Sequence, residues 1–236
     1  MLAQYSSPAL FLTDDVKKIP NSAALIEKYR NFNIEYAISN TGEFLKLGNV
    51  QQIREMLAEF FDAVYATNTQ TELSDAVLLN LEQMMTSETY LTEGIFQELR
   101  LFHQFHGNEY TLDSRQEYDT QLANMLDPAG APIPAKASLS VGLPTTQICV
   151  IEHAMQPDSA IMHQMTLDFV KKMSEGAITV ENSGKVQFDV RDKGRFIYHV
   201  RSGWLIELDK HRLTSIEGQK RDDFIKMRLL DNDGSF

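Results

Sequence analysis

The most regular feature of the chain is a run of apolar residues at helical spacing over residues 50–64. Apolar side chains recur there every three or four positions, which places them on one face of a helix. The same spacing recurs over residues 73–85 and 95–105, and Gly107 follows the last of these, where a glycine commonly ends a helix. Residues 21–107 are therefore predicted to be mainly helical.

Shorter elements precede these helices. Residues 23–29 carry apolar side chains at helical spacing behind two residues that can cap a helix. Residues 33–39 alternate between apolar and polar positions, and after a turn residues 44–47 can pair with them as a second strand. Residues 1–20 mix serine, proline and charged residues, and we expect them to form a flexible arm.

The second half of the chain changes to the alternating pattern of strands. Residues 127–134 hold three of the seven prolines, which bars a helix and indicates a loop, whereas residues 147–151 favour a strand. Four alternating runs follow, at residues 185–191, 196–201, 204–209 and 224–229. Turn signals separate them at Asp192-Lys193-Gly194, Ser202-Gly203 and Glu217-Gly218. We expect an antiparallel meander with one buried face, covered either by the N-terminal helices or by another sheet.

Residues 159–174 fit two patterns. Ile161, Met165, Phe169 and Met173 lie on one face of a helix. Strict alternation would instead place His163 and Lys171 among the apolar positions. Helix is therefore the preferred interpretation of this segment.

These elements predict an α+β fold, with N-terminal helices packed on a curved antiparallel sheet that the C-terminal half mainly forms. The predicted organisation is a flexible arm over residues 1–20, a mainly helical part over 21–107 and a β-rich part over 108–236. We expect the last two to be subregions of one compact domain.

Part of this layout is similar to that of a known group of proteins. An extended segment, a Pro/Gly-rich loop and a later meander punctuated by Gly194 and Gly203-Trp204 follow one another. Over about half of the chain this resembles uncharacterised bacterial proteins of the cell envelope. The resemblance implies extended structure over 108–140 and two strands in place of a helix over 158–176, and it implies no particular activity.

The resemblance also bears on location. Proteins of this group carry a leader, but the first five residues lack the basic start and apolar stretch of a signal peptide. We expect a periplasmic or secreted protein if a leader has been removed before Met1, and a cytoplasmic protein otherwise.

Charge and composition exclude some classes of partner. The chain of 236 residues has 22 Lys and Arg against 33 Asp and Glu, a net charge of −11. Such a charge opposes binding to nucleic acid, whose affinity for proteins comes largely from Lys and Arg. No apolar run approaches the roughly 20 residues of a membrane-spanning helix. The single cysteine cannot form a disulfide within the chain.

Two pairs of residues have the side chains of a metal or nucleophile site. His103 and His106 are one helical turn apart, a spacing that can bind zinc, but the end of a helix also favours an imidazolium and no further ligand completes a site. Cys149 and His153 would lie roughly 13 Å apart in a strand, too far for proton transfer. We expect no metal site and no cofactor, and a buried, unreactive thiol.

Basic residues gather in the predicted meander. The cluster comprises Arg191, Lys193, Arg195, Arg201, Lys210, His211 and Arg212. Strand pairing could bring several of them together as an anion-binding patch. The preferred interpretation is that they alternate with Asp189, Asp192, Glu207 and Asp209 on a solvated face. Trp204, the single tryptophan, is expected to be buried.

Two functions are open at this stage. The absence of a catalytic motif and the many Met and Phe residues favour a non-enzymatic binding or structural protein, which holds an apolar small molecule or a protein partner. The alternative is a hydrolase or transferase assembled from distant residues, with His163, His199, Glu207 and Asp209 as candidates. Neither the ligand nor the oligomeric state follows from the sequence.

Overall fold

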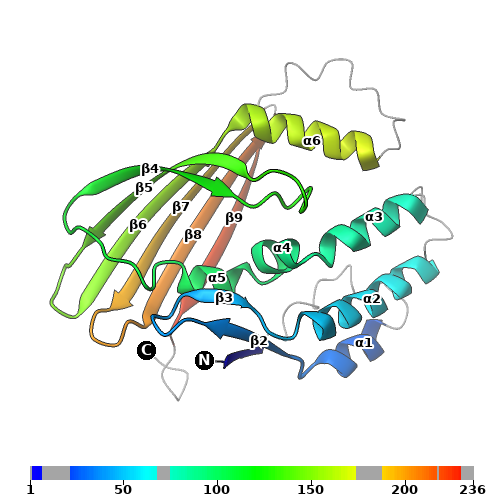
Figure 1. Ribbon diagram of the computed structural model, residues 1–236, viewed down its shortest axis with the longest axis horizontal. Helices are drawn as coiled ribbons and strands as arrows, with labels where there is room; N and C mark the ends of the chain where they lie inside the picture. Colours follow the sequence, from blue (N-terminus) through cyan, green and yellow to red (C-terminus); the bar gives the residue numbers. More distant parts are fainter. Residues whose placement is uncertain (1, 7–21, 68–74, 174–187, 217, 230–236) are drawn as a thin grey trace. The chain divides into compact units, whose positions relative to one another are not determined.

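Helices in the first half of the chain and a six-stranded antiparallel sheet in the second make this an α+β protein, as the sequence predicts (Figure 1). The computed structural model describes residues 2–6, 22–67, 75–173, 188–216 and 218–229. Contacts divide the chain into two units, Met1–Gly107 and Asn108–Phe236. None of the helices in these described segments is both long and apolar enough to span a bilayer.

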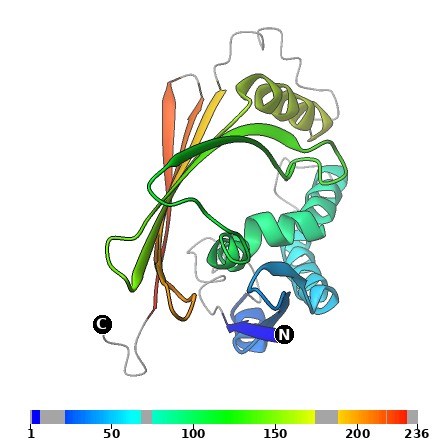
Figure 2. The same ribbon diagram turned by 60° about the vertical axis from the view of Figure 1, so that its left-hand side comes forward.

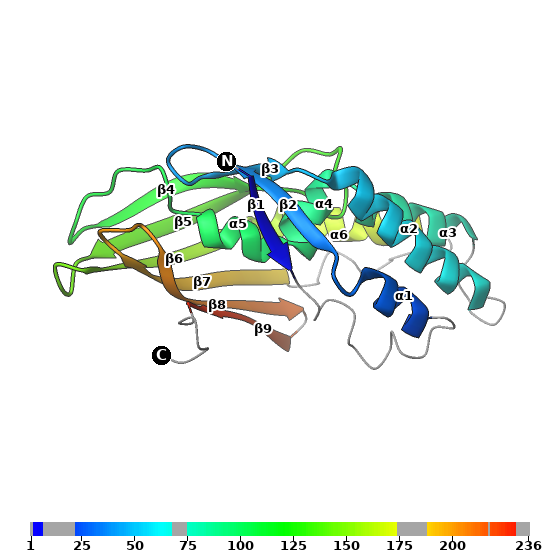
Figure 3. The same cartoon turned by 90° about the horizontal axis from the view of Figure 1, so that it is seen from below.

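The first unit combines a small sheet with helices. In this sheet β2 (Asn33–Ile38) lies between β1 (Leu2–Ser6) and β3 (Phe44–Leu47), and both pairings are antiparallel (Figure 3). The β2–β3 hairpin confirms the prediction for residues 33–47. Residues 2–6 pair with β2, so this part of the expected arm is a strand, and residues 7–20 lie outside the described residues.

The helices of this unit follow the predicted apolar spacing. They are α1 (Ser22–Tyr29), α2 (Val50–Thr67), α3 (Asp75–Met85), α4 (Glu88–Tyr90), the π-helical turn η4 (Leu91–Ile95) and α5 (Gln97–His103). The apolar stripe of α2 supplies Ile53 and Met56 to a core that also holds Ile34, Leu91 and Phe96. Burial of these side chains is the main source of stability of the unit.

The second unit is built on one sheet whose strands follow one another in chain order. They are β4 (Arg115–Leu122), β5 (Ile133–Gly142), β6 (Ile148–Pro157), β7 (Phe188–His199), β8 (Leu205–Ile216) and β9 (Gln219–Arg228). Helix α6 (Ser159–Met173) follows β6 and contacts β5 and β7. The helical interpretation of residues 159–173 is thus confirmed, and the two strands implied by the resemblance are wrong.

The two faces of this sheet differ in character. Every second residue of β5, from Ile133 to Val141, is buried, and the strand register continues this apolar face through Ile151, Phe196 and Leu208. The intervening residues form the opposite side, which we call the open face. It carries small, polar and charged side chains such as Ser138, Glu152 and Lys193.

One expectation about the sheet is wrong, and the expected curvature is limited. Asp192-Lys193-Gly194 is not a turn, because β7 runs through it without interruption. The sheet is also not strongly curled: β7 to β9 run nearly straight in Figure 2, and β7 and β8 shift register at one position, between Ile197 and Tyr198. Bulges are the usual means of bending strands, and this pair has few of them. The packing of the N-terminal helices on the sheet stays a prediction.

Candidate binding site on the open face of the sheet

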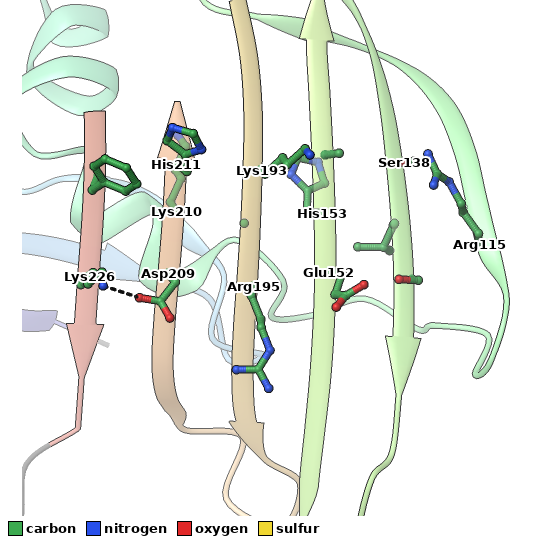
Figure 4. Close-up of a pocket in the computed structure, with 15 residues that line it drawn as sticks. Arg115, Ser138, Glu152, His153, Lys193, Arg195, Asp209, Lys210, His211 and Lys226 are labelled. Atoms are coloured by element: carbon green, nitrogen blue, oxygen red, sulfur yellow. Dashed lines mark ion pairs between the residues drawn. The ribbon is translucent and has the colours of Figure 1, made fainter. Parts of the chain in front are cut away.

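A row of alternating charges crosses the open face from one edge to the other. The register places side by side Arg115, Ser140, Glu152, Arg195, Asp209 and Lys226, one from each strand from β4 to β9. Figure 4 shows the last four at one level across neighbouring strands. Opposite charges on directly paired residues attract one another, and the row therefore helps to fix the strand register.

The next row of residues on the same face has small side chains at its middle positions. It consists of Glu117, Ser138, Ala154, Lys193, His211 and Phe224. Ser138 and Ala154 leave space above the sheet that larger neighbours surround. The imidazole of His211 closes the β9 side of this space, because it stacks on Phe224 with ring centroids 4.5 Å apart and donates a hydrogen bond to Asp222 at 2.5 Å.

These small side chains lie at the bottom of a shallow, open hollow. One part, of about 640 Å³, is lined from both rows and includes Lys193, Arg195 and Asp209. A second part, of about 460 Å³, extends toward β4 and shares Arg115, Ser138, Ala154 and Lys193 with the first. The hollow is within the range of small-molecule sites in volume, but its lining is more charged than is usual for an apolar ligand.

Among the cations that line the hollow, Lys193 has the fewest ion pairs and directly paired carboxylates. Arg115 lies 3.6 Å from Glu117, and Lys226 lies 4.0 Å from Asp209. Among the described residues neither Lys193 nor Arg195 forms an ion pair. Arg195 has carboxylates in register on both sides, Glu152 and Asp209, whereas the neighbours of Lys193 are Ala154 and His211. Lys193 is therefore not directly paired with a carboxylate, and Glu152 and Asp209 lie diagonally from it.

The hollow also contains an unused acceptor. Oδ1 of Asp209 is buried and has no hydrogen-bond partner among the described residues, because the ammonium of Lys226 is 4.0 Å away. A buried acceptor without a partner costs free energy, and a ligand hydroxyl or ammonium group could supply the missing hydrogen bond. The hollow can thus receive an acidic group near Lys193 and a donor near Asp209.

The predicted basic cluster is divided between the two faces. Arg191, Lys193, Arg195 and His211 lie on the open face, and Arg201 is in the turn after β7. Lys210 and Arg212 lie on the apolar face beside Asp192. The cause is the alternation of side chains along a strand, which sends even and odd positions to opposite faces.

Asp192 is a carboxylate on the apolar face, and its pairing with Arg212 explains why it is tolerated there. It is 2% exposed, and Arg212 donates to both of its oxygens, at 2.7 and 2.6 Å. Burial alone would raise the pKa of Asp192, but the hydrogen bonds and charge of Arg212, with Lys210 at 3.6 Å, outweigh it and hold the pKa below its usual value. This group has a structural role and does not reach the open face.

The four candidates for a catalytic site are not brought together. His163 belongs to α6, and His199 accepts hydrogen bonds from Ser202 within the turn that follows β7. Glu207 and Asp209 share the open face of β8, where they pair with Arg228 at 3.8 Å and Lys226 at 4.0 Å.

Of the paired residues that suggested metal or thiol chemistry, His103 contacts other parts of the first unit. His103 donates from Nδ1 to the carbonyl of Gly42 at 2.7 Å, and its Nε2 faces the hydroxyl of Tyr36 at 3.4 Å. Burial lowers the pKa of His103. No group of side chains in the described part of the chain could hold a metal ion. Burial also raises the pKa of the Cys149 thiol, which disfavours the reactive thiolate.

The expectation that Trp204 is buried is wrong. Trp204 is 56% exposed because it belongs to the β7–β8 turn, and the strand begins one residue later with Leu205, which is 2% exposed and takes the core position. Sequence reasoning also missed Arg115, Ser138 and Glu152 as lining residues. The regular alternation over 133–142 was the available signal for Ser138, but the meeting of all three depends on the strand register.

The geometry thus offers a solvent-accessible hollow lined by Lys193 and an unused acceptor, built from all six strands of one sheet. The hydrogen-bonded pair of His211 and Asp222 borders it on the β9 side. Comparison of the chain with protein-family models, with curated proteins and with solved structures finds no match.

Proposed function

We propose that this protein is a non-enzymatic binding protein, and that its ligand is a small molecule with an acidic group, held in the hollow of the open face. The observation that carries this proposal is the position of Lys193, which lines both parts of the hollow and is paired directly with Ala154 and His211 rather than with a carboxylate. A carboxylate or phosphate is the natural partner of such an ammonium group.

The surrounding residues restrict the ligand further. Glu152 and Asp209 line the same hollow, so a polyanion would be repelled at its margins. A ligand with one acidic end and a hydroxyl or amino group satisfies both Lys193 and the buried Oδ1 of Asp209. Ser138 adds a hydroxyl that can donate or accept. These features support a small hydroxy or amino acid, or a phosphate ester, rather than the apolar molecule expected from composition.

The experiment begins with the protein isolated gently from cells and measured by native mass spectrometry. A discrete added mass that is present in the wild type and lost in Lys193→Gln supports the proposal. Inorganic phosphate and glutamate are then titrated against the labelled protein, and amide NMR shifts are followed at Lys193 and Arg195. Loss of one charged hydrogen bond weakens binding by roughly tenfold or more.

Lys220→Gln is the matched control. Lys220 is an exposed lysine on the same face, paired with Ser215, and it lines neither part of the hollow. The proposal expects this variant to bind as the wild type does. Equal effects of the two substitutions would mean that lysine charge acts nonspecifically. No added mass together with no shift at Lys193 would refute the site.

A further inference from the structure

One end of the six-stranded sheet exposes apolar side chains on successive connections. Leu143 of the β5–β6 loop is 43% exposed, Val200 and Trp204 of the β7–β8 turn are 46% and 56% exposed, and Leu229 just after β9 is 48% exposed. We call these four residues the hairpin-end surface. Large exposed apolar side chains that gather in one place usually mark an interaction site.

Hydrogen bonds show that these connections lie together. Val200 donates its N–H to the carbonyl of Gln147 at 2.8 Å, which joins the β7–β8 turn to the β5–β6 loop. Leu229 donates to the carbonyl of Ile206 at 2.8 Å, two residues beyond Trp204. Figures 1 and 2 both show the β5–β6 and β7–β8 connections at the same end of the sheet.

The polar backbone of the β7–β8 turn is largely used within the protein. The N–H groups of His199 and Gly203 bond to carbonyls of the same turn, at 2.9 and 2.8 Å. Ser202 donates to the imidazole of His199 at 3.3 Å, and Trp204 donates to the hydroxyl of Ser202 at 3.4 Å. A turn with bonded N–H groups enters an environment poor in water at a lower cost than one with unpaired groups.

The charges of the β5–β6 and β7–β8 connections differ from those of the whole chain. The segments 143–147 and 200–204 contain no acidic residue, although the net charge of the chain is −11. Arg201 is exposed beside Val200 and supplies a positive charge at the tip. Arginine next to tryptophan and aliphatic residues is a combination suited to the boundary between lipid headgroups and acyl chains.

From these features we infer that the hairpin-end surface docks on a lipid bilayer. The side chains of Leu143, Val200 and Trp204 enter the interfacial region, and Arg201 stays at the level of the phosphates. Separate apolar tips suit a deformable lipid surface, because a protein partner would need a shape matched to each of them. The inference is independent of the ligand proposed for the open face, because none of these residues lines the hollow.

The chain provides its own reporter for the test, because Trp204 is its single tryptophan. The full protein is mixed with vesicles of phosphatidylcholine, with and without phosphatidylglycerol, and tryptophan emission and cosedimentation are measured. We expect a shift of the emission to shorter wavelength, quenching by brominated lipid, and tighter binding to the vesicles with phosphatidylglycerol.

Two matched variants locate the surface. Leu143→Ser keeps the reporter and removes an apolar tip, so vesicle affinity falls by roughly tenfold. Ile216→Ser is the control. Ile216 is 41% exposed and is the last residue of β8, at the opposite end of the sheet, so this substitution should leave binding unchanged. No change in emission or sedimentation with either vesicle would overturn the inference. It would also be overturned by equal effects of the two variants, or by an emission shift that depends on protein concentration without vesicles, which indicates a second copy as the partner.

Discussion

The guanidinium of Arg212 is bound to the carboxylate of Asp192 by two hydrogen bonds, at 2.7 and 2.6 Å, directly across the β7–β8 ladder. The pair connects two twelve-residue strands at a point where the carboxylate is 2% exposed. Its geometry has two consequences. The pair fixes the register of the strands that carry Lys193 and Asp209, and it makes stability depend on one ionised group.

Asp192→Asn is expected to destabilise the protein by about 3–5 kcal/mol, because it removes the buried charge that binds both Arg212 and Lys210. Urea unfolding measures the change. Glu27→Gln is the control, since this exposed carboxylate pairs with the exposed Arg30 at 3.5 Å, and its loss should cost about 1 kcal/mol or less. Similar losses for both variants would mean that the buried pair has no special weight.

The same carboxylate makes the protein sensitive to acid. The pKa of Asp192 is lower in the folded state than in the unfolded state, so the unfolded chain binds the proton more readily. The stabilisation is complete above the unfolded pKa, about 3.9, and is lost as the pH falls through the folded pKa. Unfolding measured in urea at several pH values should show a steeper acid loss for the wild type than for Asp192→Asn. Parallel curves would show that other groups dominate.

A second titration is predicted in the first unit. Burial is the largest cause of the lowered pKa of His103, opposed by the hydrogen bond to Gly42 and assisted by the charge of His106. The folded state thus favours the neutral imidazole. Its contribution is present above the unfolded pKa, about 6.5, and is lost as the pH falls through the folded pKa.

Proton NMR of the imidazole resonances checks this directly. The resonance that disappears in His103→Gln should titrate below the ordinary histidine range. The variant should also lose less stability than the wild type when the pH drops from about 7 toward acid. An ordinary midpoint for this resonance would show that His103 is accessible to water in solution.

The sequence predicted local periodicity well and long-range partners poorly. The apolar spacing of α2 and the alternation of β2 are properties of neighbouring residues, and both elements were predicted correctly. Asp192 looked like a turn residue because its partner Arg212 is twenty positions away. The hollow needed more still: Arg115 and Glu152 meet Arg195 only through the registers of four strands, which no local pattern specifies. Side-chain parity alone could show that Lys193 and Arg195 share a face.

Gly194 lies within β7 beside the ring of Phe196, and this close approach leads to a prediction about packing. A Cβ at this position would lie 2.6 Å from a ring atom of Phe196, which is 1% exposed and has no room to move. Gly194→Ala should therefore destabilise the protein by about 1–3 kcal/mol through overpacking. Gly142→Ala, where a Cβ meets nothing within 4 Å, should be neutral or slightly stabilising in the same urea experiment. If Gly194→Ala were as stable as Gly142→Ala, the glycine would serve no steric purpose.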